Sequence, residues 1–497
     1  MPVIFSKKEL GKNRLEGFYE TPINTVKYMC NKILKIYKPN MLICDPCVGD
    51  GIFLKYLFDQ GINKENLYGY DIDRNKINKL RKDFRNVRVF DSTKKIDKKF
   101  HIIIGNPPYA GDESYFIREN RERLSKDYKA IKAKNLFSII SYNAIQNLYD
   151  GGYFIKIISD AFLTNIYYKE FRKFLLSEIN IKEICLTPRN LFHNINADVR
   201  TCIFFGQKKK QHEVVFKNWK KNFNCKNKIK LIDRLNSEKE YNNNKKAEWI
   251  SQEEIYKYPN YQILIGISKS LRNLYLNSKI KLGDIASGGT GISTGNDRKF
   301  LRKTTIAKND RNWVPYFKNA SRQKYYYRPT FSIEKNYKKY YKKISNYLIR
   351  NEKFFFKEGI SCSSVGVRFS AAYMPEKCLF GVNANFFFKN RDDLFYILAF
   401  LNTKIAWYFS RKILIRTNNI SANYLRKMPI IFPNSKMKKK YIVKNVKKTI
   451  NQLCKNPNYD FSKFENEMND VFYSIYKIND LDKQKIERFT KNFYDEM

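Results

Sequence analysis

Ile102-Ile103-Ile104-Gly105-Asn106-Pro107-Pro108-Tyr109-Ala110 is the stretch on which the fold prediction depends. Its three isoleucines form a short β-branched run bounded by glycine, which predicts a buried strand of a parallel sheet. Two consecutive prolines cannot donate to a strand ladder, so the strand has to end there. Asn106 is thereby placed at the carboxyl end of a strand, the edge at which open α/β sheets bind ligands. Taken alone, the stretch also fits a simple strand-ending turn, because Asn and Pro are common turn formers.

A second informative stretch, Met41 to Leu54, is an apolar strand that leads into a glycine-containing loop and then a helix. Gly49 and Gly51 allow the backbone to come close to a ligand at the amino end of that helix. The spacing matches neither G-x-G-x-x-G nor a phosphate-binding P-loop. The loop therefore indicates a ligand site of another kind, or a purely structural turn.

Three predicted strands upstream of Asn106 end in aspartates, namely Asp45, Asp71 and Asp91. Asp71 follows the glycine loop by about 20 residues, the spacing at which doubly wound folds place a carboxylate on ribose hydroxyls. Asp73 is better suited to cap the next helix. Further strands are predicted at 153–158, 181–186 and 201–205. The pattern predicts an α/β fold with a doubly wound sheet.

The chain of 497 residues carries 95 Lys and Arg against 48 Asp and Glu, a formal net charge of +47. Such a surplus favours a polyanionic partner, and the 36 Tyr and 38 Phe add groups that can stack on bases. A lysine-rich but otherwise ordinary enzyme is the alternative. Nine scattered cysteines complete no zinc pattern, so we expect no metal site. No signal peptide and no apolar run of roughly 18 residues is present, so we expect a cytoplasmic protein without a membrane partner.

The motifs Phe18-Tyr-Glu-Thr-Pro22, Asp45-Pro-Cys-Val-Gly-Asp-Gly51, Tyr70-Asp-Ile-Asp73, Phe90-Asp91 and Asn106-Pro-Pro-Tyr109 follow one another in this order. The series resembles the gamma-class DNA adenine N6 methyltransferases. The resemblance covers residues 15 to 210 well and the rest more loosely. It implies a Rossmann-like methyltransferase sheet with a second, α+β target-recognition domain, S-adenosylmethionine as cofactor and double-stranded DNA as partner. A cognate restriction endonuclease is a candidate further partner.

The resemblance also assigns roles to residues. Thr21 and the loop after Asp45 would face the methionine part of the cofactor, Asp71 the ribose, Ile72 the adenine ring and Asp91 the adenine amino group. Cys47 departs from the usual Ala or Ser. The full set expected around the cofactor is Tyr19, Thr21, Asp45, Pro46, Cys47, Gly49, Gly51, Phe53, Asp71, Ile72, Asp91, Ser92 and Asn106.

The chemistry of the Asn-Pro-Pro-Tyr segment can be derived from its residues. The exocyclic amine of adenine is a poor nucleophile because its lone pair is delocalised into the ring. Acceptors on its two hydrogens, the Asn106 side-chain oxygen and the Pro107 carbonyl, would direct that lone pair at a methyl group by positioning and electrostatics. Pro108 adds rigidity, and Tyr109 would stack on a flipped base. By its place in the similar enzymes, Phe192 would stack opposite Tyr109; packing on the core is equally compatible with the sequence.

Beyond this half, we expect residues 1–210 to form the methyltransferase domain and 211–264 a basic connector. A Gly-rich opening and interspersed aromatics and cations predict a DNA target-recognition domain at 265–435. Residues 436–497 have helical periodicity and are expected to form a helical carboxy-terminal segment.

The Asn-Pro-Pro-Tyr chemistry leaves alternatives open. It would serve cytosine N4 or RNA adenine methylation, and also a protein glutamine methyltransferase, although that class does not require the basic second half. A catalytically silent DNA-binding specificity protein is a candidate from a different class. The intact acidic and glycine positions favour an enzyme.

Overall fold

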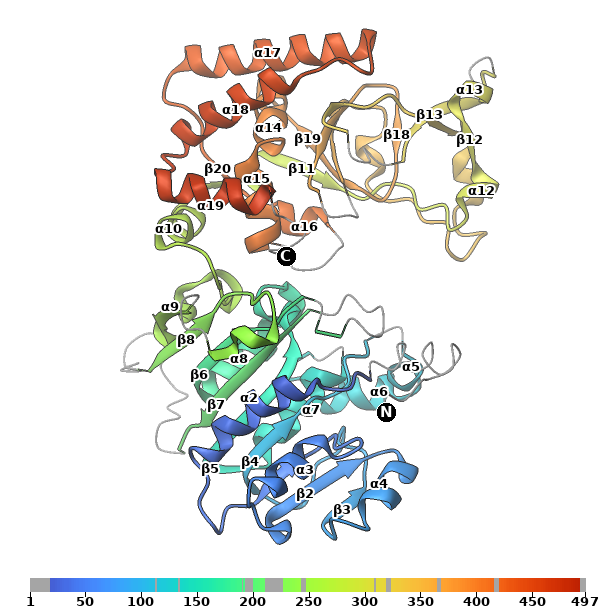
Figure 1. Ribbon diagram of the computed structural model, residues 1–497. Helices are drawn as coiled ribbons and strands as arrows, with labels where there is room; N and C mark the ends of the chain where they lie inside the picture. Colours follow the sequence, from blue (N-terminus) through green and yellow to red (C-terminus); the bar gives the residue numbers. More distant parts are fainter. Residues whose placement is uncertain are drawn as a thin grey trace. The chain divides into compact units, whose positions relative to one another are not determined.

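The computed structural model describes residues 18–111, 114–132, 135–189, 191–192, 200–210, 227–242, 247–307, 310–318, 323–363, 368–414 and 420–491. The chain divides into two compact units, Met1–Gly266 and Ile267–Met497. The first unit is drawn in blue to green in Figure 1 and the second in yellow to red. Each unit has its own sheets and its own hydrophobic core.

The first unit is built on a nine-stranded sheet with the order β3-β2-β1-β4-β5-β7-β6-β8-β9. Its strands are β1 (Ile43–Asp45), β2 (Leu67–Asp71), β3 (Val87–Val89), β4 (Phe100–Gly105), β5 (Leu148–Ser159), β6 (Ile179–Leu186), β7 (Thr201–Lys208), β8 (Lys228–Ile232) and β9 (Ala247–Ser251). The five strands β3, β2, β1, β4 and β5 pair with one another in parallel, whereas β7 runs antiparallel to both β5 and β6. This mixed, mostly parallel α/β sheet is the predicted fold class.

Helices cover both faces of this sheet. One core cluster contains the apolar faces of α2 to α4, and the other contains those of α5 to α9. The helices are α2 (Ile23–Leu34), α3 (Ile52–Asp59), α4 (Arg74–Leu80), α5 (Tyr115–Glu119), α6 (Arg121–Asp127), α7 (Leu136–Gln146), α8 (Lys169–Glu178) and α9 (Gln252–Lys257). Two burying faces explain why the central strands β1 and β4 are nearly continuous apolar runs instead of alternating patterns.

The sheet extends further along the chain than residue 210, the expected end of the first domain. Strand β8 pairs parallel to β6, and β9 pairs with β8, so these two strands, which lie within the expected connector, belong to the sheet of the first unit. The two strands were not predicted because their apolar cores are short and a polar run separates them. These cores are Ile229 and Leu231 in β8 and Ile250 in β9, and all three residues are buried. The rest of the expected connector, including 211–226 and 243–246, lies outside the described residues.

The second unit combines small sheets with helices. Its strand orders are β11-β19-β16-β17-β14, β12-β15-β13-β18 and β10-β20. The strands are β10 (Ile280–Lys281), β11 (Ala286–Gly289), β12 (Leu301–Lys303), β13 (Trp313–Phe317), β14 (Tyr325–Tyr326), β15 (Phe331–Glu334), β16 (Gly359–Cys362), β17 (Ala371–Met374), β18 (Leu379–Phe380), β19 (Ala384–Phe388) and β20 (Pro429–Ile430). The helices are α10 (Lys269–Asn277), α11 (Leu282–Ile285), α12 (Asp297–Phe300), α13 (Thr304–Ala307), α14 (Arg391–Leu401), α15 (Lys404–Tyr408), α16 (Ala422–Leu425), α17 (Lys436–Lys455), α18 (Ser462–Ile475) and α19 (Asp480–Lys491).

The last three helices occupy the stretch predicted to be helical from residue 436, and α17 packs against the apolar helix α14. No helix in the described ranges is both long and apolar enough to cross a membrane.

Candidate active site

The candidate site lies where the strand order changes direction, at the carboxyl ends of β1, β2 and β4. Strand β1 lies between β2 and β4, with Cys44 paired to Tyr68 on one side and to Ile103 on the other. Asp45, Asp71 and Asn106 therefore reach the same edge of the sheet. Such a switch point is where open α/β sheets bind ligands.

Asn106 is held by the segment that precedes α2. Its side-chain Nδ2 donates to the carbonyl oxygen of Tyr19 (2.9 Å) and to Thr21 Oγ1 (3.1 Å). These two bonds use both amide hydrogens and fix Oδ1 as the acceptor end of the side chain. The residues that join here are 85 and 87 positions apart in the chain.

Tyr109 completes this arrangement. Its hydroxyl has one hydrogen, which is donated to Asn106 Oδ1 at 2.5 Å, while the carbonyl oxygen of Ile157 lies within hydrogen-bond distance at 3.1 Å. Burial raises the pKa of the Tyr109 hydroxyl, so it remains protonated as a donor. In this structure the acceptor of Asn106 is thus in use by Tyr109.

An aromatic cluster surrounds Tyr109. The ring of Tyr19 lies 5.7 Å from Tyr109 and 5.2 Å from Phe192, and the Tyr109 and Phe192 centroids are 6.3 Å apart. Phe192 is only 3% exposed and belongs to the core cluster on that face. The two rings predicted to stack on a base are therefore neighbours, and a base between them would require them to separate.

The loop after β1 is shaped by Asp45, Gly51 and Ser92. Asp45 Oδ1 accepts from the backbone N–H of Cys47 (3.0 Å), and Ser92 Oγ donates to the Pro46 carbonyl (2.5 Å). Gly51 begins α3 at φ +79°, and a Cβ there would meet Leu80 Cδ2 at 2.5 Å. The left-handed conformation favours glycine at this position, and any side chain there would also displace Leu80.

Asp45 is the most deeply buried carboxylate of the site. Burial raises its pKa to about 6, opposed by the Lys156 ammonium and the Cys47 N–H. A Cβ on Gly105, whose φ is +141°, would meet Asp45 Oδ1 at 2.2 Å. The Asp45 carboxylate therefore occupies the space that a side chain at position 105 would need.

Asp71 connects β2 to the glycine loop. Its Oδ2 accepts from the N–H of Gly49 and its Oδ1 from the N–H of Asp73, both at 2.9 Å. Burial raises the pKa of Asp71, and these two bonds act in the opposite direction. Ile72 beside it is 51% exposed. Asp73 caps α4 by accepting from the N–H groups of Asn75 and Lys76, as predicted.

The contacts of Asp91 and the burial of Phe53 differ from those expected for residues that bind a cofactor. Asp91 Oδ1 accepts from the Thr93 N–H and hydroxyl, and Oδ2 lies 3.5 Å from Arg123 in α6. Arg123 was not identified from the sequence, and no motif pointed to it. Phe53 is only 2% exposed and packs in the core, because its position in α3 faces the sheet. Phe53 therefore presents almost no surface to a cofactor.

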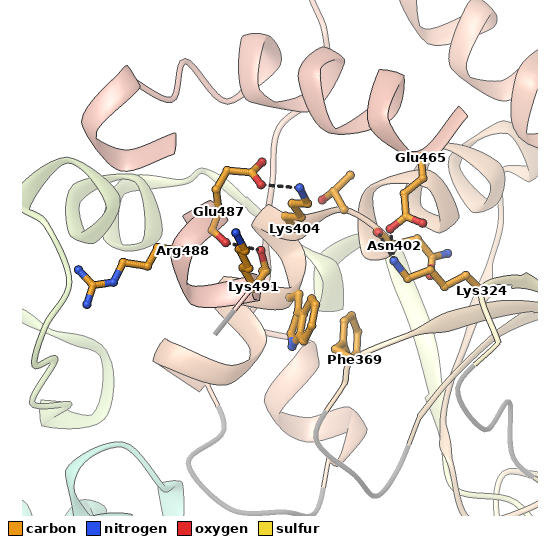
Figure 2. Close-up of a pocket in the computed structure, with 11 residues that line it drawn as sticks. Lys324, Phe369, Asn402, Lys404, Glu465, Glu487, Arg488 and Lys491 are labelled. Atoms are coloured by element: carbon orange, nitrogen blue, oxygen red, sulfur yellow. Dashed lines mark hydrogen bonds and ion pairs between the residues drawn. The ribbon is translucent and has the colours of Figure 1, made fainter. Parts of the chain in front are cut away.

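A separate cavity lies in the second unit. It has a volume of about 320 Å³ and is lined by residues from α15, α18 and α19 and by others, including Lys324 just before β14. Lys404 pairs with Glu487, and Lys324 pairs with Glu465, while Arg488 and Lys491 come from α19 (Figure 2). The two carboxylates at this cavity are thus each matched by a lysine. Across the described ranges, no group of three or more His, Cys, Asp and Glu side chains is arranged to hold a metal.

Comparisons with known proteins match the part of the chain that contains most of the candidate site. Residues 50–192 match the family model of the Eco57I restriction-modification methylases. The chain is 26% identical over 188 residues to the Type II methyltransferase M.VspI of Vibrio sp. (strain 343), covering 35% of this chain and 44% of that protein. It is 26% identical over 353 residues to the adenine-specific methyltransferase PglX of Lacticaseibacillus casei (strain Zhang), covering 64% and 28%. The chain thus spans less than half the length of each.

Two solved structures share the fold over most of the chain. The DrdV–DNA complex aligns with a TM-score of 0.57 at 13% identity, covering 89% of this chain and 58% of that chain. The ATP-dependent Type ISP restriction-modification enzyme LlaBIII bound to DNA aligns with a TM-score of 0.53 at 13% identity, covering 88% and 40%. At this identity the likeness concerns the fold alone.

Proposed function

We propose that this protein is an adenine-specific DNA methyltransferase of the restriction-modification type. The reaction is transfer of a methyl group from S-adenosylmethionine to the N6 amine of an adenine flipped out of duplex DNA. The observation that carries the proposal is the orientation of Asn106. Because Tyr19 and Thr21 take both amide hydrogens, Oδ1 is available only as an acceptor at the strand end.

The residues at this edge suit an amine substrate. Asn106 Oδ1 and the Pro107 carbonyl accept the two amine hydrogens and turn the nitrogen lone pair toward the methyl donor. Asn106 Oδ1 has two lone pairs, so the adenine amine would either use the second one or replace the Tyr109 hydroxyl on this oxygen. The effect is preorganised positioning and electrostatics. When bound, S-adenosylmethionine supplies the electrophilic methyl group.

The residues near Asp71 fit the nucleoside part of this cofactor. Each Asp71 oxygen accepts one backbone hydrogen bond and retains a second lone-pair site for a ribose hydroxyl. Ile72 has half its surface exposed beside it and can cover an adenine ring. Asp91 keeps Oδ2 for the adenine amino group, shared with Arg123. Phe53 is left out of this set because it is buried.

We further assign the enzyme to the gamma class and its second unit to target recognition. The cofactor motifs precede Asn-Pro-Pro-Tyr, and a second compact unit follows them. That unit exposes cations beside aromatic rings, as where Arg302 lies 4.4 Å above the Trp313 ring. Such groups suit phosphate and base contacts. The matches to restriction-modification methyltransferases favour a cognate restriction endonuclease as a functional partner.

The proposal is tested by incubating the full-length protein with methyl-labelled S-adenosylmethionine and a duplex DNA library. The modified nucleosides are then identified by mass spectrometry. We expect N6-methyladenine at a defined sequence and none with the Asn106→Ala variant. N4-methylcytosine, label in RNA or label in protein glutamine would each replace the proposal with the corresponding alternative.

A further inference from the structure

Lys156 in β5 is a buried cation in an otherwise apolar run. Its side chain is 0% exposed, and Nζ has no hydrogen-bond partner among the described residues. Its neighbours in the strand, Ile155 and Ile157, are fully buried core residues. An ammonium group in such a place is costly unless an opposite charge compensates it.

The strand register places that opposite charge nearby. Lys156 pairs directly with Gly105 of β4, and β4 pairs on its other side with β1, which ends at Asp45. Gly105 has no side chain, and the Asp45 carboxylate occupies the space its Cβ would fill. Lys156 and Asp45 therefore face each other across the gap at Gly105, without a direct hydrogen bond.

We propose that Lys156 is a positioning residue that holds the Asp45 carboxylate ionised across the gap at Gly105. An ionised Asp45 is the stronger acceptor for the Cys47 N–H, which shapes the loop from Pro46 to Gly51. The consequence for cofactor binding rests on the function proposed above, whereas the coupling between the two charges does not.

Other groups also face Asp45. Cys44 and Cys47 come from β1 and its loop, Cys30 from α2 and Asp71 from β2. Burial raises the pKa of all three thiols, so these remain neutral, and the negative charge of Asp71 opposes ionisation of Asp45. Lys156 is the cation among these groups.

The coupling has a defined pH dependence in the protein without cofactor. Burial raises the pKa of Asp45 to about 6, above the value of roughly 3.9 for an unfolded chain. The folded state then binds more protons than the unfolded state between these values. The contribution of Asp45 to stability is therefore full below pH about 4 and is lost as the pH rises to about 6. Removing Lys156 should extend this loss to higher pH.

The test is urea unfolding of the full-length, cofactor-free protein at pH 4 to 8.5. Lys156→Met should move the upper end of the Asp45 transition up by at least about one pH unit. The shift should vanish in the Asp45→Asn background, which removes the titrating group but leaves Asp71 and the thiols. Lys208→Met is the matched control, because Lys208 sits at the other end of the sheet, bonded to the Leu148 carbonyl. An unchanged transition in Lys156→Met, or the same shift with Asn at position 45, overturns the proposal.

A second comparison decides the matter if Lys156→Met fails to fold. Asp45→Asn leaves Lys156 without its counter-charge, so this variant should be less stable at pH 7 than Asp45→Asn combined with Lys156→Met. Equal stabilities would overturn the coupling.

Calorimetry with S-adenosylmethionine then separates this inference from the proposed function. Lys156→Met should bind about threefold more weakly than wild type at pH 6.5, since a pKa raised by about one unit from about 6 lowers the ionised fraction of Asp45 from about three quarters to about one quarter. It should approach wild-type affinity at pH 8.5. If the unfolding data show the charge coupling but the wild-type protein does not bind S-adenosylmethionine, only the cofactor assignment is refuted. Wild-type binding without the coupling would refute the role of Lys156 alone.

Discussion

Tyr109 donates its hydroxyl hydrogen to the side-chain oxygen of Asn106 at 2.5 Å. The same oxygen is the proposed acceptor for the amine of the target adenine. This oxygen has two lone pairs, so the tyrosine hydroxyl and the adenine amine would either share it or exchange places on it. The following predictions begin with this exchange.

Replacing Tyr109 by Phe removes the competing hydroxyl and keeps the ring. We expect Tyr109→Phe to methylate DNA at least as fast as wild type in single turnovers. Tyr109→Ala should lose roughly 1–3 kcal/mol of base stacking and show less fluorescence from a 2-aminopurine at the target position. A hundredfold slower Tyr109→Phe variant would show that the hydroxyl is needed in catalysis.

Asn106→Ala should abolish methyl transfer and leave DNA affinity nearly unchanged, because most affinity comes from phosphate contacts. Asn106→Asp should also be inactive, since a carboxylate cannot donate to the Tyr19 carbonyl. Gel-shift titrations beside a methylation assay check both. If the Asn106→Ala variant transferred methyl groups at the wild-type rate, the proposed mechanism would be contradicted.

Asp71→Ala should weaken S-adenosylmethionine binding by roughly 1.5–3 kcal/mol, the value of charge-assisted hydrogen bonds to the ribose. Asp71→Asn is the matched control, because it keeps the shape of the side chain. It should lose part of the cofactor affinity, since its amide group cannot accept hydrogen bonds from both Gly49 and Asp73. Calorimetry measures both variants. Unchanged affinity in a folded Asp71→Ala protein would remove Asp71 from the cofactor site.

A fragment of residues 1–266 should fold cooperatively, whereas a fragment of residues 1–210 should not. Beyond residue 210, β8 pairs with β6, Arg234 pairs with the buried Asp160, and Glu238 accepts from Thr25 in α2. Losing these contacts leaves the edge of β6 and part of the core exposed. Circular dichroism during urea unfolding distinguishes the fragments. Equally steep transitions would mean that β8 and β9 are dispensable.

Sequence choice should reside in residues 267–435. Exchanging this region for its counterpart from a related enzyme should change which adenine is modified without changing the reaction. Binding to duplex DNA should weaken steeply with salt, because lysines displace condensed counterions. Sequencing of modified bases in host DNA reads out the first effect. An unchanged target sequence would place recognition elsewhere.

Local sequence patterns predicted the strand ends at Asp45, Asp71 and Gly105 and the α/β class, whereas β3 ends at Val89, two residues before the predicted Asp91. The isoleucine run before Gly105, the cap at Asp73 and the apolar strand from residue 153 each depend on chain neighbours, so they could be predicted from the sequence. The order of the aspartates also placed the candidate site at one sheet edge. The sequence also contains a lysine, Lys156, inside that apolar strand, but its opposite charge lies on a distant segment.

Only the tertiary structure decided which of these residues meet. The addition of β8 and β9 to the sheet, the bonds from Asn106 to Tyr19 and Thr21, and the row Asp45–Gly105–Lys156 all join segments separated by many residues. The burial of Phe53 could not be predicted for the same reason, since it depends on how α3 packs against the sheet. Strand register and helix packing are set by the whole core, and periodicity in a short stretch carries no information about its distant partners.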